Sequence, residues 1–551
     1  MHNNNNSDGN INSPTNGWMF KWWMAALCIF LAAFLALFRG QDANWDLQNY
    51  HHYNPYAWVN DRAAVDIAPA QLQSFHSPYA DLPYYYMAKA GMSSWLSSIV
   101  LAIPMMIALF ILSIIARQML LASQRQSHPI NHPMLKHNFI VVCMVLMAAT
   151  GAAGGPVAGT TMSEWHLVAL FLGGFLLLLR PFTHENASPK LSLVSVLLAG
   201  LLGGSAVGLK LTAGPYAIGL AVFLMALPGS ITVRIQRVAV LAIGGIMGAL
   251  VTYGPWGYEL WTRYQNPFFP YFNDIFLSPW VEPSRFSDTR FLVRDTWKFF
   301  TTPWLIMRET TGLFIEMPFR DWRLGLGLPA LVWLACKTPA THARPLWRAL
   351  LLMFLTTYGL WALLFGYYRY VSLLELISII AIFSAVVSGS EKIKSVHGKN
   401  LMLLATVLLL LGTTRWPSWA RTEHGEMAVI ATLPSIPNNS MVIIATLEPV
   451  GYLATNFPES VPVIAIVNNF MKPVEGVEFG LRKQAMQRLA AHQGPVFALV
   501  RNTADEERYY SGQIISEMVA LSGFRIEKEQ CQLIVGKINH SKISLCAVKK
   551  I

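Results

Sequence analysis

The chain has 551 residues, of which 54% are hydrophobic and only 13% are charged. A soluble protein carries about 25% charged residues, so this composition excludes an ordinary soluble protein and places most of the chain in a lipid bilayer. The formal net charge is +11, but the basic residues do not cluster on one face. This distribution argues against a nucleic-acid-binding protein.

The N-terminal segment is polar and contains a run of asparagines from Asn3 to Asn6. Such low-complexity sequence predicts that residues 1–17 form a disordered cytoplasmic tail. The apolar stretch that follows ends in Arg39-Gly40-Gln41 and not in a small-residue cleavage site. We therefore expect a retained first transmembrane helix and not a cleaved signal peptide.

Eleven apolar stretches are candidates for transmembrane helices, since about 20 apolar residues cross a bilayer. The pattern predicts a polytopic α-helical membrane protein, with a membrane domain at 18–422 and two long outer loops at 39–94 and 257–322. The candidate stretches cover approximately residues 18–38, 95–121, 138–155, 164–180, 191–208, 212–228, 238–256, 323–336, 346–366, 371–388 and 400–414.

Lysine and arginine residues fall on alternate connections between these stretches. By the positive-inside rule the basic connections are cytoplasmic. The sequence thus predicts a multi-pass protein of the bacterial inner membrane, with a cytoplasmic N-terminus and, because the number of spans is odd, a periplasmic C-terminus. The basic connections include Lys21, Arg117, Arg180, Arg234, Arg237, Arg344 and Arg348, whereas the first outer loop is acidic, with Asp42, Asp46, Asp61, Asp66 and Asp81.

The final segment, residues 423–551, predicts a small periplasmic α/β domain. Apolar runs at 441–446, 461–467 and 496–500 predict buried strands, and the segments 480–492 and 504–522 predict helices. A hairpin near the C-terminus would place Cys531 opposite Cys546. An oxidising compartment would permit a disulfide between them, and two paired free thiols are the alternative.

An acidic, aromatic segment directly follows the first apolar stretch. Asp42 and Asp46 lie four residues apart, so a helix would place both on one face, with Tyr50 one turn further along. Carboxylates at a membrane surface are costly, which indicates a functional role. A helix N-cap or a solvated interfacial acid is the structural alternative.

Three segments together resemble GT-C fold membrane glycosyltransferases, a group that includes protein O-mannosyltransferases and the bacterial lipid A aminoarabinose transferase. The acid four residues before Tyr50 resembles the family's aspartate after the first span. The segment 75–84 is similar to a Pro-Pro-Leu-Tyr motif with Ser77 in place of the first proline, and 367–375 is similar to Arg-Tyr-x-x-Pro-Leu-Glu without its proline. The resemblance implies sugar transfer from a polyprenyl-phosphate carrier on the outer membrane face.

The resemblance also implies roles for individual residues. Asp46 is the expected general base or acceptor-orienting carboxylate, and Asp42 is expected to orient it or to replace it. Glu164, at the outer end of the fourth span, is the expected second acid, with helix capping as its alternative. Arg369 and Lys210 are expected to bind the carrier phosphate, with snorkelling to the lipid headgroups as the alternative.

Tyr50, His76 and Asp288 complete the expected substrate-binding residues. A rigid interfacial turn is the alternative for the segment that holds His76. Asp288 lies in the second outer loop, after the proline-rich segment 266–273, which is expected either to cover the site or to form a rigid turn.

The sequence does not predict a metal site or a nucleotide-sugar site. His51 and His52 are adjacent, and neighbouring residues on a helix point about 100° apart, so one ion could not easily bind both. No Gly-rich phosphate loop or Asp-x-Asp motif is present. The expected donor is a polyprenyl-phosphate-linked sugar without a certain cofactor, and the expected partners are membrane lipids and a glycan, lipid or protein acceptor. A non-enzymatic envelope assembly protein and a transporter or flippase are the alternative functions.

Overall fold

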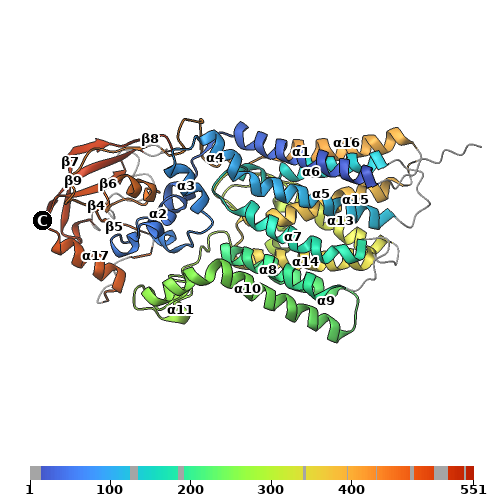
Figure 1. Cartoon of the computed structure of the whole chain (residues 1–551), viewed down its shortest axis with the longest axis horizontal. Helices are drawn as coiled ribbons and strands as arrows, with labels where there is room; N and C mark the ends of the chain where they lie inside the picture. The colour runs from blue at the N-terminus through green and yellow to red at the C-terminus, as the bar shows by residue number, and fades with distance from the viewer. Residues whose placement is uncertain are drawn as a thin grey trace, which may run out of the picture.

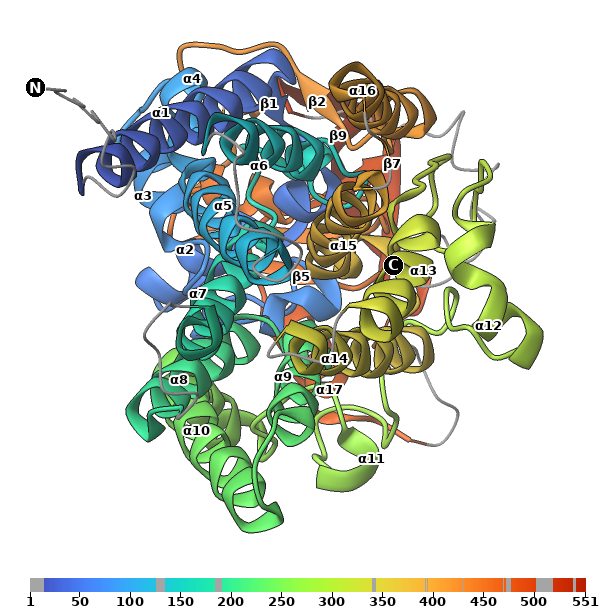
Figure 2. The same cartoon turned by 90° about the vertical axis from the view of Figure 1, so that its right-hand side faces the viewer.

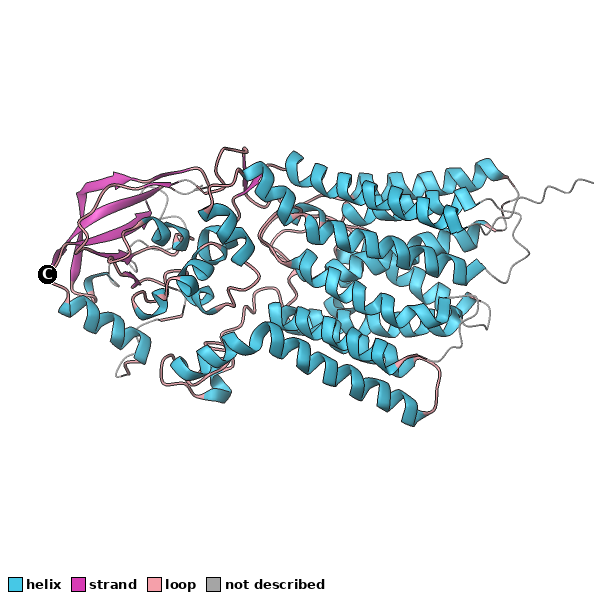
Figure 3. Ribbon diagram, in the orientation of Figure 1, coloured by secondary structure: helices cyan, strands magenta, loops and turns pink. Residues whose placement is uncertain are grey.

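The computed structural model divides into a bundle of long, approximately parallel helices and a smaller region that contains a β-sheet beyond one end of the bundle (Figure 1). We call this end the sheet end. Figure 3 shows the strands concentrated there. The structure describes residues 14–124, 134–183, 191–338, 343–391, 393, 395–429, 431–468, 470–471, 477–501, 519–538 and 542–551.

A helix of the bundle coincides with each of the eleven predicted stretches. Among the described residues, seven spans are long and apolar enough to cross a membrane. These features confirm the predicted polytopic helical membrane fold. The helices are α1 (Pro14–Phe38), α4 (Ser94–Leu101) with α5 (Ile103–Gln124), α6 (Met134–Ala149), α7 (Glu164–Thr183), α8 (Leu193–Leu209), α9 (Gly214–Ala226), α10 (Ile231–Tyr264), α13 (Arg323–Lys337), α14 (Ala343–Leu364), α15 (Ser372–Ser390) and α16 (Val396–Thr413).

Two helix boundaries differ from the prediction. Residues 14–17 belong to α1 and are not a disordered tail, whereas residues 1–13 of the predicted tail lie outside the described residues. Helix α10 continues to Tyr264, so the second long loop begins after that residue and not at residue 257.

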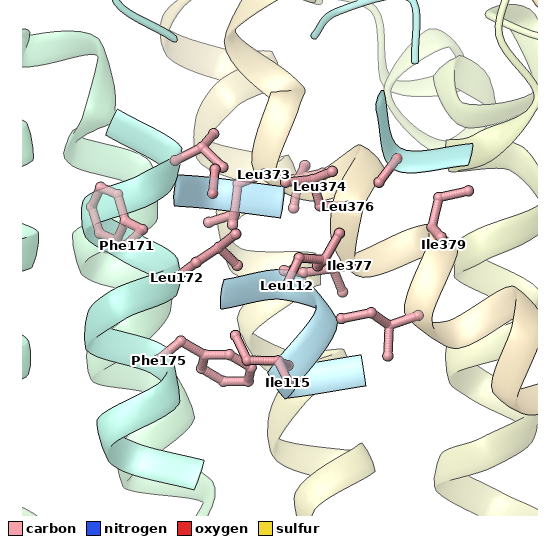
Figure 4. Packing of buried hydrophobic residues seen from close by; sticks show 14 of the residues in the cluster. Leu112, Ile115, Phe171, Leu172, Phe175, Leu373, Leu374, Leu376, Ile377 and Ile379 are labelled. Atoms are coloured by element: carbon pink, nitrogen blue, oxygen red, sulfur yellow. The ribbon is translucent and has the colours of Figure 1, made fainter. Parts of the chain in front are cut away.

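The core of the bundle lies between α5, α7 and α15. Figure 4 shows Leu112 and Ile115 of α5 and Phe171 of α7 beside Leu373 and Ile377 of α15. Among the candidate membrane spans, the one that contains α15 is the most enclosed. In its most apolar 18-residue stretch 83% of the residues are buried, whereas in that of α16 only 6% are buried. The end-on view in Figure 2 places α15 inside the bundle and α16 at its periphery. The segment that precedes α15 is therefore held firmly by its surroundings.

Helices α8 and α10 pack closely because glycines line their contact. A Cβ atom added to Gly204 would lie only 1.9 Å from the carbonyl oxygen of Gly245, and one added to Gly200 would lie 2.2 Å from the carbonyl oxygen of Leu241. Small residues four positions apart allow this close approach of helix backbones in membranes. The contact attaches the peripheral helix α10 to the bundle.

Replacing Gly204 by alanine is therefore expected to destabilise the protein. The added methyl group collides with backbone, and overpacking of this kind costs about 1–3 kcal/mol. The matched control is Gly254→Ala on α10, where the nearest atoms would lie 3.8 Å away in the Leu250 side chain. Thermal unfolding of the solubilised protein should show a lower transition for Gly204→Ala alone. Equal transitions for the two variants would contradict the close contact.

The sheet region forms one mixed five-stranded sheet in the order β5-β4-β6-β9-β7, with parallel pairing among the first three strands and antiparallel pairing of the last two. A disulfide joins Cys531 to Cys546 at paired positions of β7 and β9. The predicted helix at 504–522 lies mostly outside the described residues. The elements are β4 (Met441–Ile444), β5 (Val463–Ala465), α17 (Gly480–Ala491), β6 (Val496–Arg501), β7 (Phe524–Leu533) and β9 (Ile543–Lys550).

The sheet region is attached to the first long loop by main-chain pairing and by hydrogen bonds from a buried ion pair of the loop to main-chain groups of the sheet region. Ile67 forms a parallel bridge with Ile464 beside β5. Arg62 binds Asp66 at 2.6 Å and donates to the carbonyl of Val461 at 2.7 Å. Nearer the bundle, β1 (Gln41–Asp42) pairs with β2 (Arg421–Thr422). These contacts fix the loop that carries Asp46.

Candidate active site

The functional side chains of the first long loop are positioned by an uncommon helical turn. The segment η1 (Leu47–His51) is a π-helix, which bonds residue i to residue i+5, and it is followed by α2 (Tyr53–Val59). Asp46 directly precedes this turn. The turn ends at His51, whose ring lies 4.1 Å from that of Tyr50 and whose pKa is influenced by the charge of Asp46. Single π turns of this kind often occur at functional sites.

Asp42 does not share a helix face with Asp46, so this prediction is wrong. Asp42 lies in β1, where pairing with β2 extends the backbone. Its carboxylate accepts hydrogen bonds from the Thr161 amide and hydroxyl, both at 2.9 Å, and from the Asn44 side chain at 2.5 Å. Asp42 therefore fixes the segment that precedes α7, and its hydrogen bonds among the described residues do not include Asp46.

The structure brings together Asp46, Glu164, Lys210 and Arg369, which we call the charged cluster. Arg369 Nη1 lies 3.0 Å from Asp46 Oδ2. Arg369 Nε lies 3.0 Å from Glu164 Oε1, and Lys210 Nζ donates to the same oxygen at 2.9 Å. These residues come from the first long loop, the start of α7, the end of α8 and η6 (Tyr368–Val371).

The cluster has a buried side and an accessible side. The exposed fractions of the Glu164 and Arg369 side chains are 4% and 7%, whereas those of Asp46 and Lys210 are 17% and 18%. Snorkelling to lipid headgroups therefore does not describe Arg369. A molecule that approaches the cluster would meet Asp46 and Lys210 first.

Aromatic rings surround the cations of the cluster. The Arg369 guanidinium lies 5.6 Å from the Tyr367 ring, 5.7 Å from the Tyr370 ring and 5.3 Å from the Trp419 ring. Lys210 Nζ lies 5.3 Å from the Tyr370 ring. Such contacts help to hold the two cations in place beside the carboxylates of the cluster.

Asp46 is an ionised carboxylate at neutral pH. Burial raises its pKa, but the neighbouring cations, above all Arg369, outweigh this effect and hold the pKa below its ordinary value. Asp46 therefore keeps a negative charge beside two cations. This arrangement suits a group that stabilises developing positive charge.

Tyr50 and His76 lie beside the charged cluster. Their rings meet edge to face at 5.0 Å, and His76 Nε2 lies 2.8 Å from the hydroxyl of Tyr271. Burial and the charge of Lys210 lower the pKa of His76 to about 4, so the ring is neutral at pH 7. Because Tyr271 belongs to the second long loop, this contact joins the two long loops next to the cluster.

Asp288 does not join the cluster. Its exposed carboxylate binds Arg290 at 2.8 Å, and Arg290 also binds Glu316 at 3.1 Å. Glu316 accepts a hydrogen bond from the Tyr367 hydroxyl at 2.8 Å. Asp288 is therefore connected to Arg369 indirectly, through Arg290, Glu316 and the Tyr367 ring that lies against Arg369.

Sequence reasoning assigned no functional role to His51. His51 Nδ1 lies 2.7 Å from Asp81 Oδ1, and both side chains are buried. Asp81 directly precedes α3 (Leu82–Lys89), thirty positions after His51. The sequence offers no spacing signal for such a pair, because the fold of the first long loop creates it.

A second buried network lies behind the cluster. Arg323 and Asp321, both fully buried, form an ion pair at 2.6 Å, and Arg323 also donates to the carbonyl of Met147 at 2.9 Å. Glu375 accepts from the Tyr368 hydroxyl at 2.7 Å and from the Ala153 amide at 2.9 Å. This network supports η6, which carries Arg369. Among the described residues, no group of three His, Cys, Asp or Glu side chains is arranged to hold a metal ion.

No family model matches the sequence, and no curated protein matches it. The fold, however, is GT-C-like, as the resemblance implied. The chain is similar in structure to ArnT from Cupriavidus metallidurans, solved bound to undecaprenyl phosphate. The match has a TM-score of 0.50 and covers 97% of this chain and 98% of ArnT, at 12% identity.

Proposed function

We propose that this protein is a glycosyltransferase that moves a sugar from a polyprenyl-phosphate carrier to an acceptor on the outer face of the bacterial inner membrane. The convergence of Asp46, Glu164, Lys210 and Arg369 within a GT-C fold carries this proposal. The undecaprenyl phosphate bound to ArnT supports a carrier of the same chemical class.

The charged cluster suits the chemistry of this reaction. Lys210 and Arg369 are the proposed ligands of the carrier phosphate, because a guanidinium and an ammonium group both donate to phosphate oxygens. As the bond between the sugar and the phosphate breaks, the phosphate takes the electron pair. The ionised Asp46 then stabilises the positive charge that develops on the sugar and orients the acceptor. Glu164 keeps both cations in position.

The distribution of charge supports the orientation in the membrane. The turn between α9 and α10 lies at the far end of the bundle from the sheet (Figure 1), and Arg234 and Arg237 lie next to this turn. By the positive-inside rule, that end faces the cytoplasm and the sheet end faces the periplasm. The disulfide between Cys531 and Cys546 agrees with an oxidising compartment. We assign the proposed C-terminal domain, residues 423–551, to this face.

Replacing Asp46 by asparagine tests the proposal. In proteoliposomes that contain a radiolabelled polyprenyl-phosphate sugar, we expect sugar transfer to fall roughly 10²- to 10³-fold, because the charge aimed at the reacting sugar is lost. Binding of the carrier should persist, since Lys210 and Arg369 remain. The matched control is Asp61→Asn in the same loop, whose side chain is 75% exposed.

Two results would contradict these assignments. Transfer at the wild-type rate by Asp46→Asn would remove Asp46 from the reaction. A folded wild-type protein that transfers no sugar from a panel of polyprenyl-phosphate donors would overturn the proposed function. Uptake of solute without transfer would instead indicate a transporter.

A further inference from the structure

His51 and Asp81 form a buried pair next to the charged cluster. Asp81 Oδ1 lies 2.7 Å from His51 Nδ1, and the exposed fractions of the two side chains are 4% and 5%. A carboxylate at Nδ1 fixes the proton on that nitrogen, so that Nε2 of a neutral ring carries a lone pair. This is the arrangement in which a histidine accepts a proton from a substrate.

The other nitrogen of the His51 ring is available. His51 Nε2 is buried and has no hydrogen-bond partner among the described residues. His51 ends the π turn that Asp46 precedes, and the charges of Asp46 and Lys210 act on its ring. A buried, unpartnered ring nitrogen beside ionised groups is costly, and an acceptor hydroxyl would satisfy it.

The carboxylates of the cluster are poorly suited to take a proton. Asp46 and Glu164 both pair with Arg369, and Glu164 also binds Lys210. These cations stabilise the ionised form of Asp46 and hold its pKa below the ordinary value. A base of such low pKa removes a proton from a hydroxyl inefficiently at neutral pH.

We propose that His51, oriented by Asp81, is the general base of the sugar transfer. This inference rests on the proposed function. The acceptor oxygen forms a bond to the anomeric carbon while the bond from that carbon to the carrier phosphate breaks. The phosphate takes the electron pair of the broken bond, and the acceptor proton moves to His51 Nε2. Asp81 stabilises the imidazolium that results and acts as a positioning residue.

The proposal predicts a particular dependence on pH. Burial lowers the pKa of His51, but Asp81 and Asp46 outweigh it and raise the pKa above its ordinary value of 6.5. The ring is protonated, and therefore inactive as a base, below that pKa, so transfer should increase as the pH rises through it. The titratable and charged groups around the ring are Asp46, Tyr50, His76, Asp81, Lys210 and His166.

We call this increase of transfer with pH the rising limb, and it belongs to the His51–Asp81 pair and not to Asp46 or His76. The pKa of Asp46 is held below its ordinary value, and that of His76 is about 4. Neither group changes its protonation near or above pH 6.5. Removing the Asp81 charge by Asp81→Asn should lower the pKa of His51 and move the limb to lower pH.

The test is the pH profile of kcat for transfer from a saturating polyprenyl-phosphate sugar in proteoliposomes. For His51→Gln we expect the plateau to fall about 10²- to 10⁴-fold and the limb to disappear, with little change in KM for the donor. Asp81→Asn should lower the plateau and shift the limb. His52→Gln should retain the wild-type profile, because the buried His52 ring lies against Tyr84 and Tyr85.

Folding of each variant is checked by size-exclusion chromatography and thermal unfolding, and the shift in Asp81→Asn decides the question if His51→Gln does not fold. The base role is overturned if a folded His51→Gln variant keeps the rate and the limb. It is also overturned if only KM for the donor rises, which would make His51 a ligand of the carrier. Absence of transfer by the wild-type protein would overturn the proposed function itself.

Discussion

Replacing Arg369 by glutamine is expected to reduce sugar transfer roughly 10²- to 10³-fold and to destabilise the protein. Arg369 holds Asp46 and Glu164 together, each at 3.0 Å. Without the guanidinium, Lys210 alone faces two carboxylates, and removing one partner of a buried ion pair costs about 3–5 kcal/mol. Transfer assays and thermal unfolding of the solubilised protein measure the two effects.

The matched control for this variant is Arg415→Gln. Arg415 also pairs with a carboxylate, Glu309, but their side chains are 50% and 48% exposed. Exposed pairs contribute at most about 1 kcal/mol, so the control should unfold near the wild-type temperature and retain transfer. If Arg369→Gln behaved like Arg415→Gln, neither the phosphate-binding role nor the structural role of Arg369 would stand.

Replacing Arg323 by methionine is expected to destabilise the protein strongly. Arg323 is fully buried and binds Asp321, Thr414 Oγ1 and Thr150 Oγ1 as well as the Met147 carbonyl. Methionine fills similar space but leaves the buried Asp321 carboxyl group without its cation, at a cost of about 3–5 kcal/mol. The unfolding transition of the solubilised protein should fall accordingly.

Two further variants make this test specific. Arg290→Met removes an exposed pair with Asp288 and should change stability by less than about 1 kcal/mol. The double variant Arg323→Met, Asp321→Asn should recover part of the loss, because no unpaired charge remains buried. A double variant less stable than Arg323→Met would show that hydrogen bonds to Asp321, and not its charge, dominate.

Much of the membrane part could be predicted from the sequence. An apolar stretch of about 20 residues has few alternatives in a bilayer to a helix, so all eleven predicted stretches coincide with helices. The prediction also selected Asp46, Glu164, Lys210 and Arg369, because charged residues at the ends of apolar stretches stand out against their surroundings. Their roles in the reaction stay predictions that the proposed variants test.

The details that depend on tertiary contacts could not be predicted. A helical spacing of four suggested that Asp42 and Asp46 act together, but the pairing of β1 with a strand almost four hundred residues away overrides it. In the sequence, Asp321 and Arg323 stand where a loop meets a helix. Nothing in the sequence distinguishes this position from an ordinary junction or indicates a buried ion pair. Likewise, His51 meets Asp81 only because a π turn and the start of α3 face each other.

The attachment of the sheet region to the first long loop has a consequence for biogenesis. Arg62 finds its carbonyl partner in Val461, 399 residues later in the chain. During synthesis the first loop therefore emerges long before the strands that fix it, and every helix of the bundle after α1 must be inserted in between. The loop that carries Asp46 can take its final form only when the C-terminus has been made. A prematurely terminated chain would reach the membrane with an unfinished site and would remain inactive.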